Sequence, residues 1–83
     1  MNQYILVWDN QSVVDLRWTY AFEMASDAMA AEYAARQLRH LRGCDCLALW
    51  HETEQGEYLV ATLRRLEPKV QVWYEDGQTT RSF

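Results

Sequence analysis

The sequence contains little glycine, proline or cysteine, and each shortage excludes a class of protein. Three glycines and one proline among 83 residues are too few for a linker or a disordered tail. The two cysteines, Cys44 and Cys46, are too few and too close together for a disulfide framework. No apolar run approaches the roughly 20 residues that span a bilayer, and the stretch 1–5 lacks the features of a secretory signal. We therefore expect a soluble protein of a reducing cytoplasm, bacterial or host.

Sequence signatures of catalysis are also missing. There is no glycine-rich loop to hold a phosphate, and no glycine-rich turn presents a serine or cysteine beside a histidine. The acidic residues fall where solvent-exposed strand faces and turns are expected, so none is predicted to share a buried site with a second carboxylate, as acid–base catalysis requires. We therefore predict that the chain is not an enzyme, has no catalytic residues and uses no cofactor.

Apolar and aromatic side chains, by contrast, are plentiful. Apolar residues make up 49% of the chain, with four Trp, five Tyr and two Phe, which is enough for the dense core that a small domain needs. The length suits one domain, 1–83. The formal net charge of −4, from twelve acids and eight bases, disfavours general binding to the phosphates of DNA or RNA.

Two strands are predicted at the start of the chain. The apolar run 4–8 is rich in strand-forming residues, and the polar residues at 9–12 favour a loop after it. From Val14 to Met24 apolar and polar residues alternate. This period of two places the apolar side chains on one face of a second strand, as in an antiparallel sheet with one buried side.

A helix is predicted over 27–42. Ser26 is a favourable N-cap residue, and Gly43 is suited to the left-handed position that follows a helix. The residues expected to pack against the sheet are mostly alanines, which allow a close approach; they are Ala31, Ala34, Ala35, Leu38 and Leu41.

Three further strands are predicted in the second half, over 44–53, 58–66 and 70–74. Short turns separate them, and Pro68 interrupts the chain because proline cannot donate to a strand ladder. The tail 78–83 either adds a short edge strand or frays. The predicted fold is therefore α+β, in the order ββαβββ, with a single antiparallel sheet and one helix packed on one of its faces.

The aromatic residues point to a binding surface. Eleven aromatics exceed what one small core needs, and the strand 4–8 is apolar on both faces. Because one helix covers only one face of the sheet, we expect some of Trp8, Trp50 and Trp73 on the other face. An aromatic patch rimmed by acids is typical of protein-binding surfaces; the acids expected at this rim are Glu52, Glu54 and Glu57. The alternatives are a second small core closed by the tail, or a homodimer formed through this face.

The arginines offer a second hypothesis. They could form a phosphate-binding cluster where the helix ends near a strand end; its members would be Arg36, Arg39, Arg42, Arg64 and Arg65. The alternative interpretation is a solvated helix face whose cations complement the helix dipole. The acidic balance of the whole chain favours this alternative.

Four possible zinc ligands fall within twelve residues, namely His40, Cys44, Cys46 and His51. A Cys-x-Cys pair on a strand does not have the usual spacing of a zinc knuckle. We therefore predict no metal site, with the cysteines as small buried hydrophobic residues and the histidines half exposed.

In its format the chain resembles small acidic proteins of phages and mobile elements, including anti-CRISPR proteins. The resemblance lies in the size, the strand–helix–hairpin order and the acidic hairpin 52–57. It implies inhibition by stoichiometric binding to a host enzyme or nuclease complex, with carboxylates occupying a nucleic-acid site. The leading hypothesis is thus a non-enzymatic protein-binding module whose contact surface consists of Trp8, Trp50, Trp73 and the acidic hairpin. The alternative is a nucleic-acid-binding accessory protein that uses the arginines.

Overall fold

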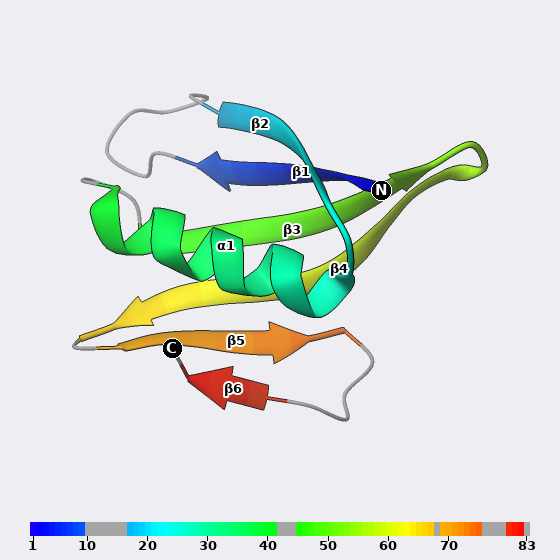
Figure 1. Ribbon diagram of the computed structural model, residues 1–83. Coiled ribbons are helices and arrows are strands. Elements are labelled where there is room, and N and C mark those ends of the chain that lie inside the picture. The colour runs from blue at the N-terminus through cyan, green and yellow to red at the C-terminus, as the bar shows by residue number, and fades with distance from the viewer. Residues whose placement is uncertain (10–16, 42–44, 68, 76–79, 83) are drawn as a thin grey trace.

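The chain forms a six-stranded antiparallel sheet with the helix α1 packed across one of its faces (Figure 1). A computed structural model of the protein describes residues 1–9, 17–41, 45–67, 69–75 and 80–82. Its elements are β1 (Asn2–Asp9), β2 (Arg17–Met24), α1 (Asp27–His40), β3 (Cys46–Thr53), β4 (Gly56–Leu66), β5 (Lys69–Tyr74) and β6 (Thr80–Ser82). The strands lie in the order β2-β1-β3-β4-β5-β6, and each neighbouring pair is antiparallel. The predicted α+β fold is confirmed, and the tail adds β6 as an edge strand.

The strand bounds differ from the predicted ones at the β3–β4 hairpin, which projects beyond the rest of the sheet (Figure 1). β4 begins at Gly56 rather than at residue 58, because the turn between the strands is only two residues long. Gly56 has a φ of 128°, a conformation that side chains with a Cβ rarely adopt. Thr53 closes the turn: its Oγ1 accepts the Gln55 N–H at 3.2 Å and donates to the Gly56 carbonyl at 2.9 Å. The predicted strand residues 14–16 and 44 lie outside the described residues.

The helix begins where the sequence predicts and ends two residues early. The Ser26 side chain accepts a hydrogen bond from the Met29 N–H at 3.2 Å, as an N-cap does. The helix ends at His40, and Leu41 is the C-cap with extended backbone angles. In this conformation the Leu41 side chain packs against the core, which explains why the apolar pattern alone extended the helix to 42. Gly43, the predicted end signal, lies outside the described residues.

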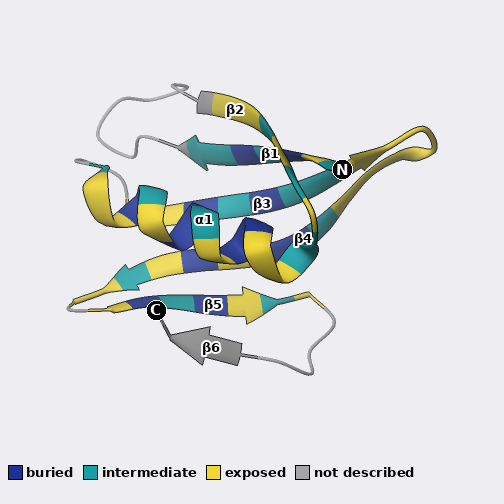
Figure 2. Cartoon of the chain, in the orientation of Figure 1, coloured by how far each residue is buried: buried dark blue, intermediate teal, exposed yellow. Residues whose placement is uncertain are grey.

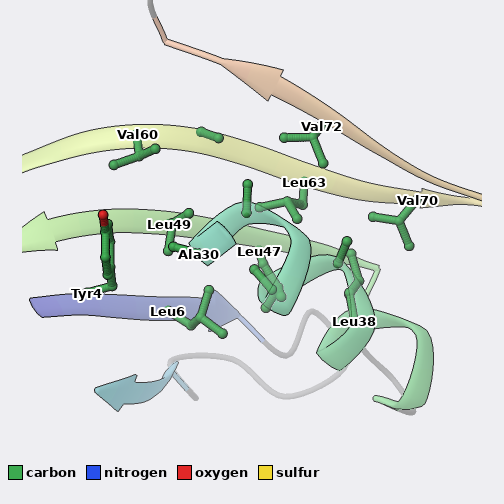
Figure 3. Close-up of a cluster of buried hydrophobic side chains, with 14 residues drawn as sticks. Tyr4, Leu6, Ala30, Leu38, Leu47, Leu49, Val60, Leu63, Val70 and Val72 are labelled. Carbon is green, nitrogen blue, oxygen red and sulfur yellow. The ribbon is translucent and has the colours of Figure 1, made fainter. Parts of the chain in front are cut away.

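The core lies between α1 and the sheet (Figure 2). Four helix alanines, Ala30, Ala31, Ala34 and Ala35, are fully buried, so the helix backbone approaches the strands closely. The gap is filled by strand side chains of which Figure 3 shows the largest. They are Tyr4, Leu6, Leu47, Leu49, Leu63, Val70 and Val72. Burying one such leucine or valine stabilises the fold by about 1.5 to 3 kcal/mol before the cost of ordering the chain.

The strand register divides the sheet into two different faces. In an antiparallel ladder the residues directly opposite each other lie on the same face. Leu6 pairs with Leu49, and Leu63 pairs with Val72; all four are buried under α1. The residues between them in sequence lie on the opposite face, which α1 does not cover. We call this second side the open face.

Candidate functional site

Two apolar rows cross the middle of the open face. In the first row, Ala21, Ile5, Trp50 and Leu59 are successive cross-strand partners on β2, β1, β3 and β4. In the second row, the partners are Thr19, Val7, Ala48, Thr62 and Trp73. Trp73 is 41% exposed, whereas Ile5 and Val7 of β1 are half-buried. The open face therefore has an apolar centre over β1, β3 and β4, and exposed Thr62 lies between this centre and Trp73 on β5.

Charged residues of opposite sign lie on either side of these rows, at the two ends of the strands. At one end, Glu23, Gln3, Glu52 and Glu57 are successive cross-strand partners, and all four are exposed. At the other end, Arg64 and Lys69 are exposed on β4 and β5. The open face is thus acidic at one end of its strands, apolar in the middle and basic at the other end.

The acidic row contains an unfavourable pair. Glu52 and Glu57 are direct partners across the β3–β4 ladder, and like charges directly opposite each other destabilise a sheet. Glu54 lies at the exposed turn of the same hairpin. These carboxylates lie outside the core, at the exposed end of the hairpin.

Trp8 does not belong to the open face. It follows Tyr4 and Leu6 in the alternation of β1, and it packs against the buried core on the side of α1. The predicted contact set of three tryptophans is therefore corrected: the structure brings Trp50 and Trp73 to the open face and places Trp8 behind it. The alternation already grouped Trp8 with Tyr4, and only the position of the helix decides which group is covered.

The predicted arginine cluster is divided between separate surfaces. Arg36 and Arg39 are exposed on α1. Arg64 lies on the open face, and Arg65, the next residue of β4, lies on the face that α1 covers. Arg42 lies outside the described residues. The described arginines therefore do not form one phosphate-binding surface.

Arg65 has a structural role at the end of the helix. Its guanidinium donates to the Leu41 carbonyl at 2.8 Å and to the Arg39 carbonyl at 3.5 Å. Asp45 Oδ1 lies 3.5 Å from the same group, and Glu67 Oε1 lies 3.9 Å away. These carbonyls are among those that a helix leaves without partners at its C-terminus, where positive charge is favoured. Arg65 thus fastens the end of α1 to β4.

The candidate zinc ligands are not brought together. Cys46 is exposed on the open face, which corrects the expectation of a buried cysteine. His51 is half-buried on the side of α1, and His40 is exposed at the helix end; Cys44 lies outside the described residues. In the part of the chain that the structure describes, no group of three or more metal-ligating side chains could hold an ion.

Sequence reasoning missed an aromatic ladder on the covered side of the sheet. Phe22, Tyr4, His51 and Tyr58 are successive direct partners on β2, β1, β3 and β4. The ring centroids are 5.6 Å apart for the first pair and 4.8 Å for each of the next two. The Tyr58 hydroxyl also hydrogen-bonds to His51 Nδ1. The ladder carries no local signal in the sequence, because it depends on the long-range β1–β3 pairing that sets Tyr4 beside His51.

The ladder is tied to the start of the helix through Asp27. The Tyr4 hydroxyl donates to Asp27 Oδ1 at 2.6 Å and accepts from Asn2 Nδ2 at 3.2 Å. His51 Nδ1 lies 3.6 Å from the same carboxylate. Burial of the phenol, reinforced by the hydrogen bond to Asp27, raises the pKa of Tyr4 to about 12. Tyr4 therefore stays protonated at neutral pH and acts as a hydrogen-bond donor.

An open pocket of about 470 Å³ lies beside this cluster, between the start of β1 and the β3–β4 hairpin. Its lining residues are Met1, Asn2, Gln3, His51, Glu52, Thr53 and Glu54. Its acidic rim belongs to the same hairpin that borders the open face.

Comparisons with protein-family models, with curated proteins and with solved structures found no match to this chain. Among the described residues, no helix is long and apolar enough to cross a membrane.

Proposed function

We propose that the chain is a non-enzymatic protein-binding module whose contact surface is the open face. The observation that carries the proposal is the apolar centre of this face, with Trp50 in its middle and exposed Trp73 at its side. Exposed apolar patches with a polar rim are typical of protein interfaces, and tryptophan is among the residues that contribute most to binding energy.

The acidic hairpin adds a preference for cationic contacts. Glu52, Glu54 and Glu57 are all exposed on it, and they lie next to the apolar rows rather than apart from them. The finer form of the proposal, which follows the resemblance to anti-defence proteins, is an inhibitor that binds a host enzyme or nuclease complex stoichiometrically. In that form the carboxylates would occupy a site that otherwise holds nucleic-acid phosphates.

The test is binding without turnover. A tagged protein captures partners from a host lysate in high salt and nuclease, the partner is identified and purified, and binding is measured by calorimetry. We expect one-to-one binding that falls at least tenfold in Trp73→Ala and in the double charge reversal Glu52→Lys/Glu54→Lys. Met29→Ala is the matched control, because Met29 is 49% exposed on α1, away from the open face.

Two results would contradict the proposal. Unchanged binding by both open-face variants would reject the surface. Partners that disappear after nuclease treatment, with salt-sensitive binding to nucleic acid weakened by Arg39→Ala, would instead support the arginine hypothesis.

A further inference from the structure

The charge pattern of the open face is complementary to itself. We propose that two copies of the chain pack through their open faces around a twofold axis that lies between the sheets, perpendicular to the strands. This inference rests on the proposed function, because it assigns a partner to the same face. The rotation reverses the strand direction, so the acidic end of one copy lies over the basic end of the other.

The two charged residues that pair between the copies both lie on β4. Glu57 and Arg64 are both exposed on the open face of this strand, at opposite ends, roughly 20 Å apart at the usual rise of a strand. The proposed axis places each β4 over the β4 of the second copy in the opposite direction. Glu57 of one copy then faces Arg64 of the other, and the contact occurs twice. It also places a cation beside Glu57, which relieves its repulsion with Glu52.

The sizes of two side chains on β3 are compatible with the same twofold axis. Trp50 and Ala48 are two residues apart on β3, on the open face, and they belong to the two neighbouring apolar rows. An axis between the rows places each large Trp50 side chain over the small Ala48 of the second copy. Two sheets interdigitate at a separation of about 10 Å when large side chains of one face small side chains of the other.

The open face is large enough for a stable contact. Five strands about 4.8 Å apart and about eight residues long present roughly 600 Å² per copy. Two such faces bury roughly 1,200 Å² together, at the lower end of specific protein interfaces. Arg64 and Lys69 would repel a uniformly basic partner, and the acidic row would repel the phosphates of nucleic acid. A second copy instead matches both ends.

The dimer would also regulate the proposed function. Because the same face serves both contacts, the dimer must dissociate before the open face can bind another protein. Self-association and capture of a different partner therefore compete, and free monomer is the binding form.

The test is sedimentation equilibrium of the purified chain over a range from micromolar to millimolar concentration. We expect a monomer–dimer equilibrium in which Glu57→Arg and Arg64→Glu each raise the dissociation constant at least tenfold. The double variant Glu57→Arg/Arg64→Glu should restore dimerisation, because it exchanges the signs of both twofold-related contacts. Arg36→Glu on α1 is the control for a change in net charge. All three positions are exposed, and circular dichroism and thermal melting confirm that each variant is folded.

Three results separate the possibilities. A dimer weakened by each single variant and restored by the double variant supports this axis. A dimer whose dissociation constant these variants leave unchanged uses another surface, such as the outer edge of β2, and overturns the inference. A monomer at every concentration also overturns it, but the proposed function still stands if Trp73→Ala loses a captured protein partner. If that loss is not seen either, both proposals fail.

Discussion

The most direct test of the described structure is the alkaline pH dependence of its stability. Tyr4 is fully buried, and its hydroxyl donates to Asp27 Oδ1 at 2.6 Å. Ionisation of this phenol would place a negative charge in the core beside a carboxylate. Replacement by phenylalanine keeps the ring that stacks on Phe22 and removes only the titrating group, so Tyr4→Phe isolates this effect.

The raised pKa of Tyr4 sets the direction and size of the change in the free energy of unfolding with pH. Burial and the Asp27 contact raise the pKa of Tyr4 from 10 to about 12 in the folded protein. The stabilisation is fully present below pH 10 and is lost as the pH rises through 12, because the unfolded chain loses the proton first. A difference of two pH units corresponds to about 2 to 3 kcal/mol in the free energy of unfolding, with about half of it lost by pH 11. Near neutral pH, loss of the hydrogen bond should make Tyr4→Phe less stable by about 1 kcal/mol.

The assay is urea unfolding of both proteins from about pH 8 to about pH 12. Other tyrosines, the lysine and the arginines titrate in both proteins, so the difference between the two stability curves reports Tyr4. We expect the wild-type advantage of about 1 kcal/mol to be constant up to about pH 9 and to disappear between about pH 10.5 and 11. By about pH 12 the wild type should be less stable than Tyr4→Phe by about 1 kcal/mol. A difference that stays constant across this range would show that the phenol ionises equally easily in the folded and unfolded states, and would refute the buried hydrogen-bonded geometry.

Three further predictions concern stability and use urea unfolding at neutral pH. Ser26→Ala should cost about 1 kcal/mol, because the Met29 N–H loses its cap; an unchanged midpoint would contradict the capping geometry. Ala34→Leu should cost about 1 to 3 kcal/mol, because fully buried Ala34 faces the sheet without room for more atoms. Arg65→Ala should destabilise by about 1 to 2 kcal/mol through the lost helix-end hydrogen bonds, whereas Arg64→Ala on the open face should change stability by less than about 0.5 kcal/mol.

Local patterns predicted the elements well because each depends on neighbours in sequence. The alternation that ends at Met24 requires only that one face of a strand be buried, and Ser26 caps its own helix. The bounds were less accurate where the tertiary structure decides them. Leu41 continues the apolar helix pattern, yet it leaves the helix because its side chain reaches the core in an extended conformation and its carbonyl accepts from Arg65.

The arginine cluster shows a different kind of error. Arg64 and Arg65 are adjacent in sequence, and the period of two in a strand sends adjacent side chains to opposite faces. The strand prediction over 58–66 was therefore already inconsistent with a joint site. By contrast, the contact of Tyr4 with His51 and Asp27 depends on a β1–β3 register that no local pattern specifies.

The Glu52–Glu57 pair allows the folding and binding contributions of the open face to be separated. Direct like-charge partners destabilise the isolated sheet, so Glu57→Gln should raise the free energy of unfolding of the monomer by about 0.2 to 1 kcal/mol. The same variant removes the carboxylate that faces Arg64 of the second copy, so it should weaken the proposed dimer. A residue that merely stabilises the chain would change both quantities in the same direction. Opposite changes, measured by urea unfolding of dilute protein and by sedimentation equilibrium, would identify Glu57 as a binding residue that the fold tolerates at a cost; a loss of monomer stability would contradict this account.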